Sequence, residues 1–138
     1  MIPLLCLIIA VTDGDSLKAR CGEPGQYQQL TIRLAEIDAP ELKQPFGNRS
    51  KQSLAALCFQ QWANIRPTAK DRYGRIVARV ECQQIDASAY QVQHGMAWAY
   101  TKYQTDQAIA PLQQAAQAAG LGLWADAQPV APWDWRRR

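Results

Sequence analysis

Two short segments in the first third of the chain concentrate carboxylates. Residues 13–16 read Asp-Gly-Asp-Ser, and residues 36–41 read Glu-Ile-Asp-Ala-Pro-Glu. Half of the 12 acidic residues of the chain lie between Asp13 and Glu41. Carboxylates, backbone carbonyls and water are the ligands that Ca²⁺ prefers in proteins. If the fold places the two segments side by side, they form a site for a hard divalent cation.

A third segment is rich in arginine. Residues 71–75 read Asp-Arg-Tyr-Gly-Arg, and the stretch from Arg66 to Arg79 holds five basic residues against one acid. A guanidinium group can donate two parallel hydrogen bonds to a phosphate, which a lysine cannot do. A cation site that faces such arginines suits phosphodiester hydrolysis, because both charges stabilise the transition state and a carboxylate can activate water. Each segment alone is typical of an ordinary turn, so the prediction depends on all three together.

The composition is that of a folded globular protein. The chain has 138 residues, of which 48% are hydrophobic and 20% are charged, and these values exclude a disordered chain, a collagen-like repeat and a protein with several membrane spans. The net charge of +3 equals 15 basic minus 12 acidic residues, and the run of arginines at 136–138 accounts for all of it. The net charge is therefore weak evidence for a polyanionic partner, and the local placement of charge must carry that argument.

Cysteine and histidine spacing argues against a zinc site. The cysteines are Cys6, Cys21, Cys58 and Cys82; no two of them form a Cys-x-x-Cys pair, and His94 is the only histidine. The cysteines are compatible with buried free thiols or with one or two disulfides. Cys58 and Cys82 are expected on inner faces, near enough for a disulfide, with Cys21 as an alternative partner. We expect His94 to be a structural residue at the surface, at the end of a helix.

The apolar segment at residues 1–10 has two interpretations. It resembles the hydrophobic part of a signal peptide, but no basic residue precedes it, no small-residue cleavage site follows it, and it is too short to span a bilayer. Its run of apolar residues, rich in isoleucine, favours a first strand at residues 4–11 that is buried on both faces. We therefore expect no removable leader within this sequence.

Alternation and turn residues divide the first half of the chain into β-strands. Strands are predicted at residues 4–11, 16–21, 30–37, about 62–67 and 76–82. Helices are predicted at about residues 49–61, between Asp86 and Gly95, and at about 109–119. One face of the first helix is predicted to carry Leu54, Leu57, Cys58 and Trp62. Five short antiparallel strands with helices predict an α+β, mainly β fold: a five-stranded OB-type Greek-key barrel packed with three α-helices.

Together, these segments resemble the pattern of the staphylococcal nuclease (thermonuclease) family. That pattern is Asp-Gly-Asp-Thr, Arg-x-x-x-x-Asp-[Thr/Ala]-Pro-Glu, Asp-[Lys/Arg]-Tyr-Gly-Arg, Gly-[Leu/Met]-Ala and a Gly-Leu-Trp ending, which this sequence follows at residues 13–16, 33–41, 71–75, 95–97 and 122–124. The resemblance covers about residues 7–125. It implies a single nuclease domain in residues 1–138, with an irregular C-terminal tail at 126–138.

The resemblance implies a Ca²⁺ site. Asp15 and Asp38 match the family's carboxylate ligands, Ala39 would contribute its backbone carbonyl, and Asp13 matches an outer-shell carboxylate that orients bound water. Ala39 stands where many members carry threonine, which matters little if only the carbonyl binds. Ser16 likewise replaces threonine and keeps the hydroxyl group.

The resemblance also implies catalytic and substrate-binding residues. Glu41 matches the general base, or the group that positions the attacking water, and Arg33 and Arg75 match two phosphate-binding arginines. The positions that match contacts to the rest of a bound nucleotide are Arg72 and Tyr73, beside a terminal phosphate, and Tyr100 or Tyr103, beside a base.

The expected function is Ca²⁺-dependent hydrolysis of phosphodiester bonds in DNA and RNA with low sequence specificity, since the catalytic groups address phosphate and none reads a base edge. The substrate would be single-stranded or locally opened duplex. The alternative is a catalytically silent OB-type module that binds single-stranded nucleic acid or a protein partner. We expect a monomer without stable membrane association. The resemblance implies a secreted or periplasmic protein, whereas a chain that lacks a leader would be cytoplasmic.

The final segment, residues 133–138, reads Trp-Asp-Trp-Arg-Arg-Arg. Its arginines could bind phosphates or lipid headgroups. We expect instead that the tryptophans fold back on the barrel or that the segment is mobile.

Overall fold

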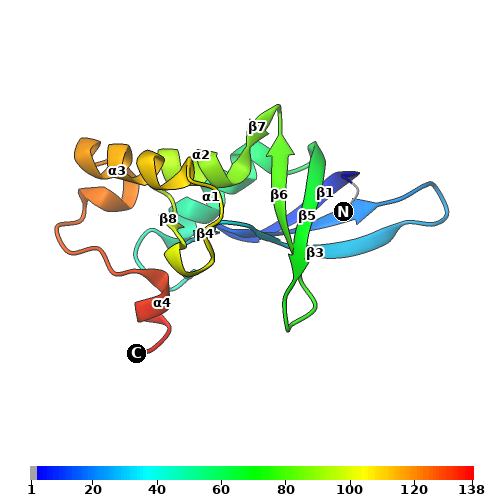
Figure 1. The fold of residues 1–138 in the computed structure, drawn as a ribbon. Coiled ribbons are helices and arrows are strands. Elements are labelled where there is room, and N and C mark those ends of the chain that lie inside the picture. Colours follow the sequence, from blue (N-terminus) through cyan, green and yellow to red (C-terminus); the bar gives the residue numbers. More distant parts are fainter. Residues whose placement is uncertain (1–2) are drawn as a thin grey trace.

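The computed structural model describes residues 3–138, and five long strands form its centre (Figure 1). They are β1 (Leu4–Asp13), β2 (Ser16–Cys21), β3 (Gln28–Leu34), β5 (Trp62–Lys70) and β6 (Ile76–Cys82). The strands are hydrogen-bonded in the order β3-β2-β1-β5-β6, and a further pairing of β3 with β6 closes the barrel. The predicted five-stranded barrel is therefore confirmed. Its closing pair is parallel rather than antiparallel, because an odd number of alternating strands can close only by joining two that run in the same direction.

Three very short strands complete the sheets. β7 (Ile85–Asp86) pairs with β6, while β4 (Ile37–Asp38) and β8 (Trp98–Ala99) form a separate two-stranded sheet. The single strand predicted at residues 30–37 is thus divided between β3 and β4. The division falls at Glu36, whose positive φ of 77° is incompatible with an extended strand.

The helices gather at one end of the barrel, and the β2–β3 hairpin extends from the other end (Figure 1). The three longer helices are α1 (Gly47–Cys58), α2 (Ala87–Gln93) and α3 (Ile109–Ala119). Asp86 caps α2 as predicted, because its carboxylate accepts a hydrogen bond from the Ala89 N–H at 2.9 Å. His94 is exposed at the end of α2, which confirms its predicted surface position.

Short helical turns follow in the last third of the chain. The 3₁₀ helices η1 (Thr101–Tyr103) and η2 (Gly122–Ala125) flank α3, and α4 (Pro132–Trp135) lies near the C-terminal end. The tail at 126–138 is therefore not irregular throughout, since α4 forms one helical turn that begins at a proline in its first position. Within residues 3–138, no helix is both long enough and apolar enough to cross a bilayer.

The buried core joins the inner face of the barrel to the helices. Cys6 and Ile8 of β1 are fully buried, but Leu5 is 61% exposed, so the prediction that β1 is buried on both faces is wrong. Only one face of a barrel strand meets the interior. The apolar face predicted for the first helix is buried in α1 at Leu54, Leu57 and Cys58. Trp62 does not share it, because α1 ends at Cys58 and Trp62 begins β5, where it is 57% exposed.

All four cysteines are paired in two disulfides. Cys58–Cys82 fastens the end of α1 to β6, as the sequence suggests. Cys21 is not the alternative partner of this pair, because it bonds to Cys6, which lies directly opposite it in the β1–β2 ladder.

Candidate functional site

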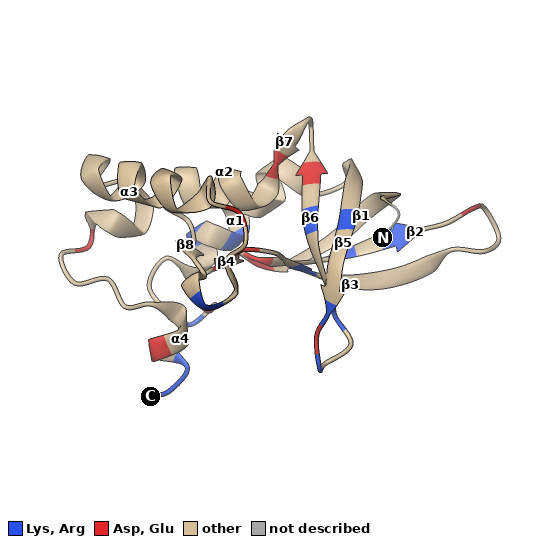
Figure 2. Cartoon of the chain, in the orientation of Figure 1, with Lys and Arg blue, Asp and Glu red and all other residues tan. Residues whose placement is uncertain are grey.

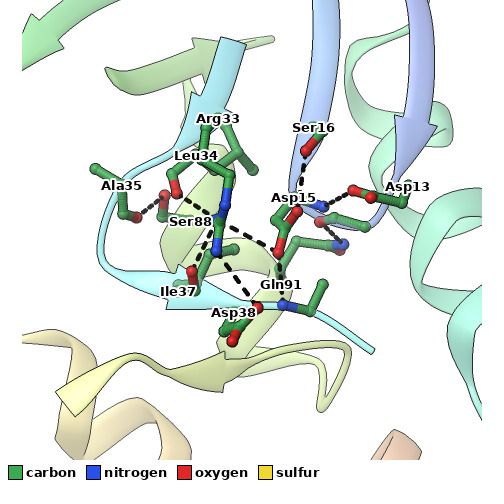
Figure 3. Close-up of polar contacts among 12 residues, drawn as sticks. Asp13, Asp15, Ser16, Arg33, Leu34, Ala35, Ile37, Asp38, Ser88 and Gln91 are labelled. Atoms are coloured by element: carbon green, nitrogen blue, oxygen red, sulfur yellow. Dashed lines mark hydrogen bonds and ion pairs between the residues drawn. The ribbon is translucent and has the colours of Figure 1, made fainter. Parts of the chain in front are cut away.

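The two acidic segments meet at Arg33, near the end of β3 (Figure 3). Its guanidinium lies 3.3 Å from the Asp15 carboxylate and 3.4 Å from the Asp38 carboxylate. The guanidinium is fixed in place because Nη1 also donates to the backbone carbonyls of Leu34 and Ile37, both at 2.9 Å. The structure thus brings the segments side by side, as the sequence predicts.

A direct hydrogen bond joins the two segments. The Ala39 N–H donates to Asp15 Oδ2 at 2.7 Å, and the Ser16 hydroxyl donates to Asp15 Oδ1 at 3.1 Å. Asp13 accepts a hydrogen bond from the Asp15 N–H at 3.0 Å, which is the local pattern of an Asx turn. The positions of the two aspartates and of Ala39 therefore depend on one another.

The acidic turn requires glycine at its centre because α1 packs directly against it. A Cβ at Gly14 would lie 1.8 Å from Ser50 Oγ and 2.8 Å from the Ala39 Cβ. Ser50 is fully buried and donates to the Met96 carbonyl at 2.6 Å, so its hydroxyl has a structural role.

Gln91 is a supporting residue that the sequence analysis did not identify. Its amide nitrogen donates to the carbonyls of Gly14, at 2.8 Å, and Ser50, at 2.9 Å, and its Oε1 accepts from the Ser53 hydroxyl at 2.7 Å. It thereby connects α2 with α1 and with the acidic turn. The one signal in the sequence is a polar residue four positions after Ala87, on the same helix face.

Arg136 brings a second guanidinium to the acidic residues from the C-terminal segment. Its Nη2 lies 2.6 Å from Asp38 Oδ2, and its Nη1 lies 3.1 Å from Asp38 Oδ1 and 2.7 Å from Glu41 Oε1. The hydrogen bond to Asp38 is the main reason that the pKa of Arg136 is raised. The sequence analysis did not place Arg136 at the site, because the run at 136–138 shows only that the segment is basic.

The carboxylates differ in their pKa. Burial raises the pKa of Asp13 to about 7, and the negative charge of Asp15 adds to the shift. Burial also raises the pKa of Asp38, although Arg136 opposes the shift. Burial acts in the same direction on Asp15, but Arg33 and several hydrogen bonds outweigh it and lower the pKa. The neighbouring arginines therefore favour the ionised form of Asp15 strongly enough to lower its pKa, but they do not do so for Asp13 and Asp38.

Glu41 borders an open hollow of about 430 Å³. The hollow is lined by Asp13, Glu41, Leu42, Lys43, Trp135 and Arg136. The Glu41 side chain is 38% exposed, so water can reach it. Its backbone N–H donates to Gln44 Oε1 at 3.1 Å, which fixes the start of the loop before α1.

Arg75 forms its ion pair with Asp71 of its own turn rather than with the acidic segments. Its Nε donates to Asp71 Oδ2 at 2.7 Å within the β5–β6 turn, and in the described chain, residues 3–138, its guanidinium forms no other ion pair. The backbone nevertheless places the two predicted phosphate-binding arginines near each other. Arg75 directly precedes Ile76, which pairs with Ile32, the neighbour of Arg33.

The four predicted substrate-binding residues fall in two places. Arg72 and Tyr73 lie in the turn between β5 and β6, which carries charged residues (Figure 2). The guanidinium of Arg72 lies 5.0 Å from the ring centre of Tyr73. Tyr100 and Tyr103 lie at η1, with their rings edge to face and 5.1 Å between centroids. Tyr103 is exposed, whereas Tyr100 stacks on Trp133 with parallel rings and 5.5 Å between centroids.

The donor chemistry at the acidic segments fits a hard cation. Within residues 3–138, no three acidic, histidine or cysteine side chains converge into a metal cluster by themselves. Asp15 and Asp38 nevertheless offer carboxylate oxygens beside one guanidinium, and burial raises the pKa of Asp38, so a further positive charge would favour its ionised form. Ca²⁺ also accepts backbone carbonyls and water, so Ala39 and solvent can complete such a set.

Sequence comparisons with known proteins point to one family. The model of the family described as "Staphylococcal nuclease homologue" matches residues 31–126. A Haemophilus influenzae protein named as an uncharacterized endonuclease is 42% identical over 133 residues, which cover 96% of this chain and 73% of that protein. A Shigella flexneri protein named micrococcal nuclease is 37% identical over 141 residues, covering 94% of this chain and 79% of that protein. The chain belongs to the staphylococcal nuclease family.

Proposed function

We propose that this nuclease hydrolyses phosphodiester bonds of DNA and RNA, with Ca²⁺ held by the two acidic segments. The observation that carries the proposal is the meeting of Asp15 and Asp38 at one guanidinium, that of Arg33, at 3.3 and 3.4 Å. Buried carboxylates that share a site are unfavourable unless positive charge accompanies them. Hydrolysis of a phosphodiester would need positive and negative groups at one site, so this arrangement supports the proposal.

Asp15, Asp38 and the backbone carbonyl of Ala39 would hold the ion. When bound, Ca²⁺ supplies positive charge that stabilises the negative charge developing on the phosphate oxygens. Asp13 accepts a hydrogen bond from the Asp15 N–H and would orient water beside that ligand. The hydrogen bond from the Ala39 N–H to Asp15 keeps the two segments in register.

Glu41 would activate the attacking water. Its side chain borders the open hollow and is 38% exposed, whereas Asp38 beside it is 1% exposed. A carboxylate that water can reach is able to take a proton from it, which a fully buried carboxylate is not. This difference supports Glu41 as the general base and Asp38 as a ligand.

Arg33 and Arg75 would bind the phosphate in its transition state. Arg33 is oriented in advance by the carbonyls of Leu34 and Ile37, so little reorganisation accompanies the reaction. Asp71 holds Arg75 through its Nε, at 2.7 Å, and not through its Nη groups. The groups assigned here would address phosphate rather than a base edge, which supports low sequence specificity.

The exposed aromatic and basic residues would bind the rest of the nucleotide chain. Arg72 and Tyr73 project from the tip of the β5–β6 turn, and Tyr103 offers an exposed ring for stacking. The face of Tyr100 that stacks on Trp133 becomes available to a base only if Trp133 moves.

Cleavage of circular plasmid DNA and of RNA tests the proposal. We expect cleavage in Ca²⁺ and none when a chelator is added. E41Q should lower turnover by about 10²- to 10⁴-fold while nucleotide binding persists. The control E81Q changes an exposed glutamate on β6 and should leave both unchanged.

Three outcomes would contradict parts of this proposal. Cleavage that survives the chelator would remove the divalent ion from the mechanism. Binding of nucleic acid without any cleavage would favour the catalytically silent OB-type module. Equal loss of binding and turnover in E41Q would show that Glu41 is structural rather than catalytic.

A further inference from the structure

The C-terminal segment returns to the site and is held at three points. The Val130 carbonyl accepts a hydrogen bond from Gln44 Nε2 at 2.5 Å. Trp133 stacks on Tyr100, with an interplanar angle of 1°. Arg136 then follows α4 and reaches the carboxylates, beside the hollow that it helps to line. The segment therefore contacts the proposed metal ligand Asp38, the proposed general base Glu41, and Tyr100, which is proposed to stack on a nucleobase.

Arg136 occupies both oxygens of a carboxylate that a cation would use. Its Nη2 and Nη1 lie 2.6 and 3.1 Å from the two oxygens of Asp38, and its Nη1 also lies 2.7 Å from Glu41. Charge-assisted hydrogen bonds with this forked geometry belong to the stronger class. Arg136 is 40% exposed while Asp38 is 1% exposed, so the arginine can leave toward solvent and the aspartate cannot.

We propose that Arg136 competes with the divalent cation for Asp38, so that the C-terminal segment closes the site at low Ca²⁺ and is displaced when Ca²⁺ binds. The inference rests on the Ca²⁺ site proposed above. A guanidinium and a divalent ion on one carboxylate repel each other. Arg136 competes more directly than Arg33, because it hydrogen-bonds both oxygens of Asp38, at 2.6 and 3.1 Å, whereas Arg33 approaches one of them at 3.4 Å. Displacement also frees Glu41 from its ion pair, so the same event uncovers the general base.

Competition of this kind is reciprocal. If Arg136 weakens Ca²⁺ binding by some factor, Ca²⁺ weakens the docking of the C-terminal segment by the same factor. Couplings between two sites are typically about 5- to 150-fold. Because Arg136 is partly exposed and solvent weakens its ion pairs, we expect a factor of about 5 to 10.

Calorimetric titration of the full chain with Ca²⁺ tests the competition, with R136Q compared against R137Q. Both variants lose one positive charge, but Arg137 is exposed and forms no ion pair within residues 3–138. We expect R136Q to bind Ca²⁺ about 5- to 10-fold more tightly than the wild type, and R137Q to bind within about twofold of it. Equal affinities of the two variants, or weaker binding by R136Q, would overturn the inference.

Hydrogen exchange gives a readout that is independent of affinity. In the wild type, Ca²⁺ should speed amide exchange in residues 133–138, and in R136Q this exchange should be fast without Ca²⁺. Exchange that Ca²⁺ leaves unchanged in the wild type would also overturn the inference. If the wild type, R136Q and R137Q all fail to bind Ca²⁺, the proposed Ca²⁺-dependent function fails together with the inference about Arg136. If all three bind equally and cleave, only the inference about Arg136 fails.

Discussion

Replacing Gln91 by leucine tests whether a buried amide supports the acidic turn. The side chain is fully buried and makes hydrogen bonds to the carbonyls of Gly14 and Ser50 and from the hydroxyl of Ser53, at 2.8, 2.9 and 2.7 Å. Leucine is of similar size but has no polar atoms. In Q91L the two buried carbonyls therefore lose the amide donor that they share.

The expected loss of stability follows from these contacts. Leaving the buried Gly14 carbonyl without this donor costs about 1–3 kcal/mol. The Ser50 carbonyl keeps its helical partner, so the hydrogen bonds lost at Ser50 and at Ser53 add about 0.5–1.5 kcal/mol each, which gives about 2–6 kcal/mol in total. Leucine offsets part of this cost because its side chain loses no hydrogen bonds to water on burial, which leaves an expected loss of about 2–4 kcal/mol in the free energy of unfolding. For a domain of this size the loss corresponds to a fall in Tm of about 8–16 °C.

Thermal and urea denaturation of Q91L and Q93L provide the assay. Gln93 lies on the same helix but is exposed, so the same substitution there should change stability by no more than about 0.5 kcal/mol. Nuclease activity of Q91L, assayed at a temperature below its Tm, should also be lower than that of the wild type, because the unsupported carbonyl belongs to Gly14, between the two aspartates of the turn. If Q91L unfolds within about 0.5 kcal/mol of Q93L, the amide does not support the turn.

Three further changes probe other parts of the account. R75K should lower turnover by about 100-fold with little change in Tm, because lysine cannot reproduce the fork, and near-full activity would exclude Arg75 from the mechanism. Arg79 holds the pKa of Asp106 below its ordinary 3.8, so ionised Asp106 stabilises the fold above that pH and the benefit disappears as the pH falls below it. D106N should therefore lose less stability than the wild type on acidification from about pH 5 to about pH 2.5, as measured by urea denaturation, and equal losses would refute the assignment. The pair C58A/C82A should lower the free energy of unfolding by about 3 kcal/mol in the absence of reductant, and an unchanged urea midpoint would show that this disulfide does not stabilise the fold.

Matched controls separate these effects from general changes in charge. R66K makes the same substitution as R75K at an exposed position on β5 and should retain activity. E23Q removes an exposed carboxylate from the turn before β3 and should lose stability on acidification as the wild type does.

Local sequence patterns predicted most of the barrel. The strands predicted at residues 16–21 and 76–82 have the observed bounds, because apolar alternation and flanking turn residues are local signals. The errors arise where tertiary packing decides. Leu5 reads as part of a buried run but faces outward, and Trp62 fits the period of a helix that has already ended.

The candidate site divides in the same way. The sequence motifs predict that Asp15 and Asp38 lie at one site, because both motifs carry carboxylates that suit the same cation. Gln91 and Arg136 could not, because their contacts join residues 77 and 98 positions apart and neither residue lies in a motif. The sequence predicts that Arg75 faces phosphate, but no local pattern indicates that Asp71 holds its Nε.

A crystal structure with Ca²⁺ and a nucleoside bisphosphate would test the central claim most directly. The account predicts an ion bound by the carboxylates of Asp15 and Asp38 and by the carbonyl of Ala39, with Arg33 and Arg75 on the phosphate. An ion bound elsewhere, or a phosphate that neither arginine contacts, would contradict it.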